Sequence, residues 1–181
     1  MKNLWLFILL VASGCGLDKG KHIDREKFTF KTGDDTELFF KNVRQSYYDL
    51  EENKAAKFNV FRYEDRPVAS DEPIIHLAIV INYMQDEAYL LVEPNAYLSD
   101  TDPIEIKAAP KNGGESKIVV LKEMNKEAML AFASDLYELL LKDYQFAVNI
   151  NGQWEPVLDA KEERAAFRIT VSDYYRLVRV Y

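Results

Sequence analysis

The feature that most restricts the fold is a run of ten residues, 74–83, that is apolar on both faces of an extended chain. One face carries Ile75, Leu77, Ile79, Ile81 and Tyr83, and the other carries Ile74, His76, Ala78, Val80 and Asn82. Residues that are branched at Cβ favour strands, and a strand that is apolar on both sides must be covered on both sides. The run therefore predicts a central strand of a sheet.

Further strand-like segments flank this run and are separated by short turns. They are residues 57–63, 88–93, 104–108, 117–121, 146–150 and 153–157. Asn151-Gly152 lies between the last two, and these residues readily supply the positive φ angles of a type I′ turn, which predicts a tight hairpin. Because short connections join neighbouring strands, we expect antiparallel pairing.

Residues 126–142 form the clearest predicted helix, with Asn125 as its N-cap. Its apolar residues recur at helical spacing and form one stripe, which is too short for a coiled coil and should pack on the sheet. The stripe comprises Met129, Phe132, Ala133, Leu136, Leu139 and Leu140.

Two further segments predict shorter helices. Residues 36–51 combine helical spacing with aromatic residues that also suit a strand; we favour a helix, with Asp34, Asp35 or Thr36 as its cap. Residues 159–162 resemble a capping box that opens a helical turn. The alternation of Phe167, Ile169 and Val171 with polar residues predicts a last strand, and Ser172-Asp173 a terminal helical turn.

Together these elements predict an α+β fold: an antiparallel sheet built from successive hairpins, packed by one long amphipathic helix and one or two shorter helices. The chain is 48% apolar and 13% aromatic, which excludes a disordered chain. We find no repeat or low-complexity linker, and we expect residues 28–181 to form a single globular domain.

The N-terminus has the pattern of an export signal. Lys2 precedes an unbroken apolar run at residues 4–12, and small residues follow. Nine helical residues extend about 14 Å, roughly half the thickness of the hydrocarbon core of a bilayer, so this run is too short to span it.

The small residues end at the only cysteine, and Ala12-Ser13-Gly14-Cys15 resembles the lipobox of bacterial lipoprotein precursors. Ala12 stands where Leu is usual. The resemblance implies a signal peptide at residues 1–14, cleavage before Cys15, and acylation of Cys15 by diacylglycerol and a further fatty acid such as palmitate. Residues 15–27 would then be a lipidated cysteine and a polar tether. The residue after Cys15 is Gly16 and not the Asp that retains such lipoproteins in the inner membrane. The resemblance therefore favours a location in the outer membrane if the host is Gram-negative.

Two other interpretations of this segment stay open. One is an ordinary secretory signal cut near Gly14, and the other is a cytosolic apolar N-terminus. A buried structural cysteine is excluded, because a signal segment has no folded core around it. Two or three acyl chains hold a protein firmly in a bilayer, whereas one gives only reversible attachment.

Charge and cysteine content exclude several kinds of partner and site. The chain has 30 acidic and 23 basic side chains, a net charge of −7, and removal of residues 1–14 deletes Lys2 alone, so 22 minus 30 gives −8. An acidic surface repels phosphate backbones, so we expect no nucleic-acid partner. One cysteine cannot form an internal disulfide or the usual structural zinc sites.

The sequence marks no catalytic, cofactor or metal site, and we expect none. Nucleophile-elbow, zinc-protease, phosphate-loop and dinucleotide-binding motifs are all missing. His76 is the one histidine outside the tether, and its place within a strand favours a structural role. Asp100-Thr101-Asp102 resembles part of a calcium-binding loop, but the later ligand positions are not filled.

The aromatic surplus is the remaining functional signal. Several tyrosines and Trp154 lie near predicted loops, where they serve either as core and edge packing or as contacts for a protein or glycan. We single out Trp154, Tyr174 and Tyr175 as partner-contact residues. The anchor and the lack of catalytic motifs indicate a non-enzymatic envelope module that binds another envelope protein or a surface polymer. The alternatives are an acidic inhibitor or immunity-type protein for a basic enzyme, and an anchored carboxylate-dependent glycan or cell-wall hydrolase.

Overall fold

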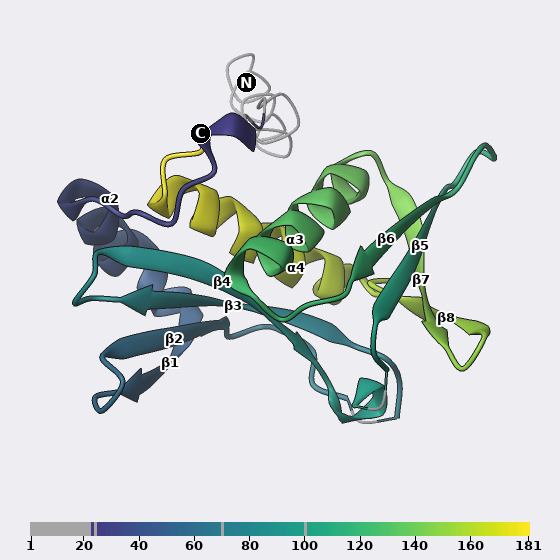
Figure 1. Cartoon of the computed structure of the whole chain (residues 1–181), viewed down its shortest axis with the longest axis horizontal. Coiled ribbons are helices and arrows are strands. Elements are labelled where there is room, and N and C mark those ends of the chain that lie inside the picture. The colour runs from purple at the N-terminus through teal and green to yellow at the C-terminus, as the bar shows by residue number, and fades with distance from the viewer. Residues whose placement is uncertain (1–22, 24, 70, 100) are drawn as a thin grey trace, which may run out of the picture.

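The computed structural model describes residue 23 and residues 25–69, 71–99 and 101–181. The predicted signal peptide, Cys15 and most of the predicted tether lie outside the described residues. The described chain folds into two antiparallel four-stranded sheets with helices packed between and beside them (Figure 1). This confirms the predicted α+β class. Among the described residues, no helix is both long enough and apolar enough to cross a bilayer.

The first sheet contains β1 (Tyr48–Asn53), β2 (Phe58–Tyr63), β3 (Ile75–Asn82) and β4 (Glu87–Pro94), in that order. β3 lies inside the sheet and is buried on both faces, as predicted from its sequence. On one face, Ile75, Leu77 and Ile79 join the main core. On the other face, Ala78 and Val80 pack in a small separate cluster with Val60, beneath partly buried Phe58, Tyr89 and Leu91.

The second sheet has the order β6-β5-β7-β8, with β5 (Ile104–Pro110), β6 (Lys117–Leu121), β7 (Tyr144–Ile150) and β8 (Gln153–Val157). Asn151 and Gly152 have φ angles of 52° and 86°, which confirms the tight turn between β7 and β8. The successive hairpins are therefore correct, but they are divided between two sheets.

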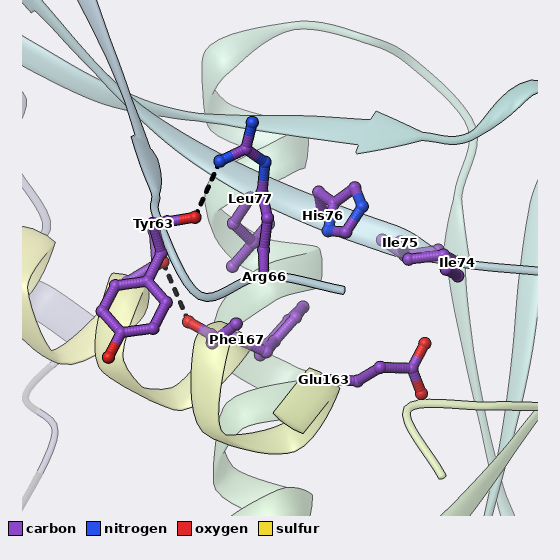
Figure 2. Close-up of a pocket in the computed structure, with 10 residues that line it drawn as sticks. Tyr63, Arg66, Ile74, Ile75, His76, Leu77, Glu163 and Phe167 are labelled. Atoms are coloured by element: carbon purple, nitrogen blue, oxygen red, sulfur yellow. Dashed lines mark hydrogen bonds between the residues drawn. The ribbon is translucent and has the colours of Figure 1, made fainter. Parts of the chain in front are cut away.

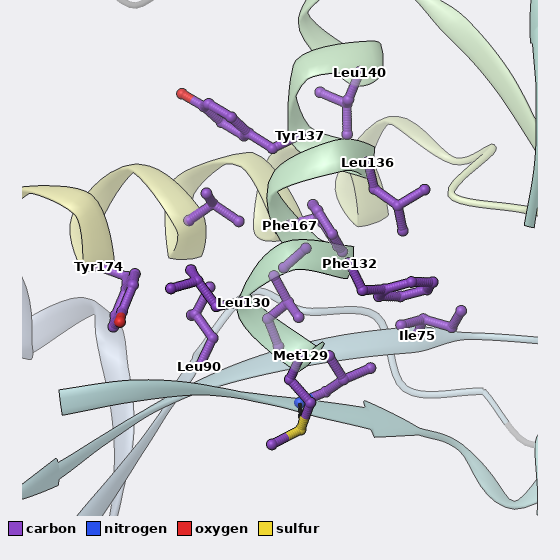
Figure 3. Packing of buried hydrophobic residues seen from close by; sticks show 14 of the residues in the cluster. Ile75, Leu90, Met129, Leu130, Phe132, Leu136, Tyr137, Leu140, Phe167 and Tyr174 are labelled. Atoms are coloured by element: carbon purple, nitrogen blue, oxygen red, sulfur yellow. Dashed lines mark hydrogen bonds between the residues drawn. The ribbon is translucent and has the colours of Figure 1, made fainter. Parts of the chain in front are cut away.

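Helix α3 (Lys126–Leu141) joins the two sheets into one core. The side chain of Asn125 accepts a hydrogen bond from the backbone N–H of Ala128 at 2.8 Å, which confirms the predicted N-cap. α3 packs against β4 of the first sheet and against β6 and β7 of the second. Figure 3 shows its apolar stripe, including Met129, Phe132 and Leu136, directed into the shared core.

Helix α4 (Lys161–Leu177) corrects two sequence predictions. Its N-cap is Ala160, with Glu163 bonding back to it, one residue later than the predicted box at 159–162. The expected strand around Phe167, Ile169 and Val171 is wrong, because these residues lie within a helix of 17 residues. One buried stripe of α4 recurs at helical spacing: Glu163, Ala166, Phe167, Thr170, Val171, Tyr174 and Tyr175. Near its end the helix is buried more widely, with Ser172, Asp173 and Leu177 also inside. α4 packs against β2, β3 and β4 and so covers the first sheet.

The N-terminal part of the described chain is helical before it enters β1. α2 (Asp34–Phe39) continues into the π-helical turn η2 (Phe40–Arg44) and the 3₁₀ turn η3 (Gln45–Tyr47). The predicted helix is thus correct as far as Tyr47, but its N-cap is Gly33 and not Asp34, Asp35 or Thr36, and a strand begins at Tyr48. Two further 3₁₀ turns are η1 (Arg25–Lys27) and η4 (Ala96–Leu98). The Arg25 guanidinium pairs with Asp135 and Glu138 of α3 at 2.6 and 2.7 Å, which attaches the end of the predicted tether to the domain.

Candidate functional site

The candidate site is built around Trp154, which lies on β8 directly after the Asn151-Gly152 turn. Its side chain is 39% exposed, and it pairs across the sheet with Asn149 of β7. Residues that are directly opposed in antiparallel strands share a face of the sheet. The register therefore identifies which other residues lie on the same side as Trp154.

Those residues form what we call the outer face of the second sheet. It consists of Val120 and Ile118 from β6, Glu105 and Lys107 from β5, Asn149 and Ala147 from β7, and Trp154 and Pro156 from β8. All of them are exposed or partly exposed, with Ile118 at 53%. The alternate residues Ile106, Val119 and Val148 are buried on the side that α3 covers. One face of this sheet is thus core and the other is surface.

Polar side chains hold the centre of the outer face in place. The Asn149 side chain donates to Glu105 Oε2 at 2.9 Å and accepts from the backbone N–H of Gly152 at 2.9 Å. The ammonium group of Lys107 lies 5.1 Å from the centre of the Trp154 ring, within the range of a cation–π contact. The Trp154 ring therefore stands among partners that the fold has already ordered.

A shallow polar hollow of about 260 Å³ adjoins this cluster. Thr101, Asp102, Glu105, Asn149 and Asn151 line it, so it contains two carboxylates and two amides, and one of these residues, Asn149, is paired with Trp154 across the sheet. An exposed indole offers a flat apolar surface, and carboxylates and amides accept and donate hydrogen bonds. The arrangement suits a ligand or partner that has both an apolar face and hydrogen-bonding groups.

Two of the predicted contact residues are wrong. Tyr174 and Tyr175 are 0% exposed, and neither can touch a partner in the folded protein. The Tyr174 hydroxyl donates to the Ala88 carbonyl at 3.3 Å, and the Tyr175 hydroxyl donates to Ser134 Oγ at 2.7 Å. Burial raises the pKa of both hydroxyls. These tyrosines pack the core and satisfy buried acceptors there.

His76 lies at a narrow hollow between β3 and α4, shown in Figure 2. The hollow measures about 10 Å³, close to the volume that one water molecule needs. Burial lowers the pKa of His76, and the neighbouring Arg66 lowers it further. The Arg66 guanidinium is held by the Tyr63 carbonyl at 2.8 Å. A substrate would not fit there, which agrees with the structural role expected for His76.

An acidic cleft of about 410 Å³ lies where the loop before β3 meets β8 and the start of α4. Asp71, Glu72, Glu155, Asp159 and Glu163 line it. Burial raises the pKa of Glu163, and the charges of Glu72 and Asp159 raise it further, against hydrogen bonds from two backbone N–H groups. The cleft concentrates negative charge in a chain that is acidic overall.

The described part of the chain contains no group of three or more His, Cys, Asp or Glu side chains that is arranged to hold a metal ion. Of the predicted calcium-like triplet, Asp102 lines the polar hollow, and Asp100 lies outside the described residues. The proposed lipidation site, Cys15, also lies outside them.

The polar residues around Trp154 were not predicted from the sequence. Trp154 was identified by its place after a turn, but Glu105, Lys107 and Asn149 come from two other strands. A signal for them was present, because each alternates with buried residues in its strand and so belongs to the solvent side. What sequence could not supply was the pairing of β5 with β7 across α3.

Comparison with known proteins assigns this chain to no family. A scan against protein-family models finds no match, and searches of curated proteins and of solved structures find no significant one. The functional argument therefore depends on the sequence and the geometry of this chain.

Proposed function

We propose that the protein is a bacterial envelope lipoprotein that is anchored through acylated Cys15, and that its domain binds an envelope protein or a surface polymer through the outer face around Trp154. It acts as a binding or assembly module and not as an enzyme. The anchor is supported by the apolar run and the lipobox-like Ala12-Ser13-Gly14-Cys15.

One observation carries the binding role: a tryptophan that is 39% exposed stands on an open sheet face beside a hollow lined by hydrogen-bonding groups. Exposed aromatic residues surrounded by ordered polar groups are typical of energetic centres of interfaces. Tyr137, Tyr174 and Tyr175 are buried in the core of this fold, whereas Trp154 remains accessible to solvent.

The anchor is tested by Cys15→Ser. The parent should partition into detergent with the membrane fraction, whereas the variant should be found in the soluble fraction or as an uncut precursor. If the variant still partitions like the parent, acylation at Cys15 does not hold the protein.

The binding role is tested by Trp154→Ala in the anchored protein. Truncation of an aromatic interface centre costs about 2 kcal/mol or more, equivalent to roughly 30-fold in Kd. We expect that loss in capture of the partner from a detergent extract of envelopes. Tyr83→Ala is the matched control, because Tyr83 is 41% exposed in the β3–β4 turn, away from the outer face. Equal effects of the two substitutions, or none for Trp154→Ala, would contradict the proposal.

The acidic cleft supports a second candidate, an inhibitor or immunity-type protein for a basic enzyme. A mature charge of −8 and five carboxylates around one cleft would accelerate encounter with a cationic partner. Such binding should weaken steeply as salt rises to physiological strength. Binding that is insensitive to salt but lost in Trp154→Ala would favour the outer face.

The hydrolase alternative would place its chemistry in the polar hollow, where Asp102 and Glu105 lie together. Glycoside hydrolysis commonly needs two carboxyl groups. Turnover of glycan or peptidoglycan substrates that is abolished by Glu105→Gln would replace the binding proposal with this one. Binding without turnover would support the binding module.

A further inference from the structure

Exposed apolar side chains gather on the N-terminal helical segment. Leu38 is 60% exposed, Phe39 46%, Val43 47% and Tyr47 48%. Leu38 and Phe39 end α2, Val43 lies in the π-helical turn η2, and Tyr47 lies in the 3₁₀ turn η3. Single exposed apolar residues are ordinary, but several on consecutive turns of one segment indicate an interaction surface.

The β3–β4 turn lies at the same end of the molecule. The backbone N–H of Thr32 donates to the Asp86 carbonyl at 2.9 Å, and Lys31 Nζ donates to the Gln85 carbonyl at 3.0 Å, just before α2 begins. This turn carries Met84, which is 68% exposed. We call Leu38, Phe39, Val43 and Met84 the end patch.

The charged groups beside the end patch are largely paired with one another. Lys41 lies 3.2 Å from Glu37, Arg44 lies 2.8 Å from the buried carboxylate of Asp173, and Arg179 pairs with Asp35. These three pairs balance one another, and Asp34 and Asp86 add negative charge nearby. A surface of this kind would be covered through burial of apolar area and would not require a charged partner.

The path of the chain indicates what covers the end patch. Ile23 follows Cys15 by eight positions, and a fully extended chain over eight steps spans at most about 28 Å. Ile23 packs against the core and Arg25 is held by α3, so an anchor at Cys15 would keep the domain close to the bilayer. Figure 1 shows the start of the described chain, the C-terminus and α2 on one side of the molecule.

We propose that the end patch rests on the bilayer that holds the acyl chains of Cys15. This inference depends on the proposed anchor. Apolar and aromatic side chains at the headgroup boundary add burial to that of the acyl chains. In Figure 1, α2 lies at one end of the longest axis and β8 at the other. Contact through the end patch would therefore hold the Trp154 face away from the membrane.

The test uses the lipidated mature protein in vesicles of phosphatidylethanolamine and phosphatidylglycerol, with and without bromine-labelled acyl chains. Trp154→Phe leaves the chain from Cys15 onward without tryptophan, and Phe39→Trp then adds one in the end patch. Brominated lipid should quench the emission of this tryptophan. The matched control is Ile118→Trp in the same background, because Ile118 is 53% exposed on β6 of the other sheet. The control tryptophan should keep its emission.

Flotation of the protein with the vesicles separates the two claims. A second variant, Leu38→Trp, is made in the same Trp154→Phe background. If the protein floats but the emission of neither Phe39→Trp nor Leu38→Trp is quenched, the anchor stands and the bilayer contact is wrong. If the protein does not float, the anchor fails and this inference fails with it. Equal quenching of the Ile118→Trp control would also overturn the inference. So would a blue shift in the fluorescence of Phe39→Trp that appears without vesicles and grows with protein concentration, because it would show that a second copy of the chain covers the patch.

Discussion

Asp173 is 1% exposed in α4, and its carboxylate is surrounded by three donors. Oδ2 accepts from Arg44 Nε and from the Tyr48 hydroxyl, each at 2.8 Å, and Oδ1 accepts from Arg176 at 3.0 Å. Burial, together with the nearby Asp173 charge, raises the pKa of Tyr48. These bonds connect α4 to η2 and β1, so this carboxylate fixes the N-terminal helical segment to the body of the domain.

Asp173→Ala should therefore be strongly destabilising. Removal of one partner of a buried ion pair leaves the other charge without compensation and costs about 3 kcal/mol or more. Asp49→Ala is the control, because Asp49 pairs with Arg66 but is 59% exposed at its side chain, and such pairs contribute less than about 1 kcal/mol. Urea denaturation should separate the two variants clearly. Similar midpoints would show that the Asp173 cluster does not stabilise the fold.

Among the elements, the hairpins were predictable because their signals are local. The β7–β8 turn needs positive φ at two successive residues, and Asn151-Gly152 supplies it without reference to the rest of the chain. Likewise, the stripe of α3 and the N-cap at Asn125 can be read within one window of sequence. Each of these elements was predicted close to its observed bounds.

Helix α4 was missed because two periods coexist in its sequence. Phe167, Ile169 and Val171 alternate, which favours a strand, but Phe167, Thr170, Val171 and Tyr174 also recur at helical spacing. Tertiary packing decides between them, because only the helix buries the last set against the first sheet. The same error left Tyr174 and Tyr175 in a short terminal turn after the predicted strand, where they looked available to a partner, whereas Trp154 was correctly placed after a turn.

The first turn of α4 is stabilised by a carboxylate whose protonation should affect stability. Glu163 Oε2 accepts from the backbone N–H groups of Asp159 and Ala160 at 3.0 and 3.2 Å. Burial nevertheless raises the pKa of Glu163 above its usual 4.5. The folded protein therefore keeps this proton to a higher pH than the unfolded chain, and the contribution of Glu163 to stability falls as the pH rises from about 4.5.

Glu163→Gln retains an acceptor for the same N–H groups and removes the titration. We expect the variant to be modestly more stable than the parent near neutral pH, and the difference to shrink below about pH 4.5. Urea denaturation across this range measures it. Glu162→Gln, at the exposed neighbouring position, should keep the pH dependence of the parent. A loss of stability at neutral pH for Glu163→Gln would show that the charged carboxylate is the stabilising form.

At the scale of the whole molecule, the division into two sheets could not be predicted. β7 pairs with β5 only because α3, which follows β6 in the chain, packs on the sheet and brings β7 to the free edge of β5. No local sequence signal indicates which hairpins pair with each other. The main core nevertheless runs without a break through both sheets and both long helices. Leu136 of α3, labelled in Figure 3, is 0% exposed at this junction. The two sheets should therefore unfold as one cooperative unit.

Leu136→Ala tests this cooperativity in the chain of residues 16–181, which lacks Cys15. Truncation of a fully buried leucine costs about 3–4 kcal/mol, whereas Leu38→Ala, at a leucine that is 60% exposed, should change stability by less than about 0.5 kcal/mol. Far-ultraviolet circular dichroism follows all elements, and fluorescence of Trp154, the one tryptophan in this chain, follows the second sheet. Because α3 holds both sheets, the two signals should show one coincident transition in the parent and in Leu136→Ala. Separate transitions would mean that each sheet has a core stable enough to unfold alone.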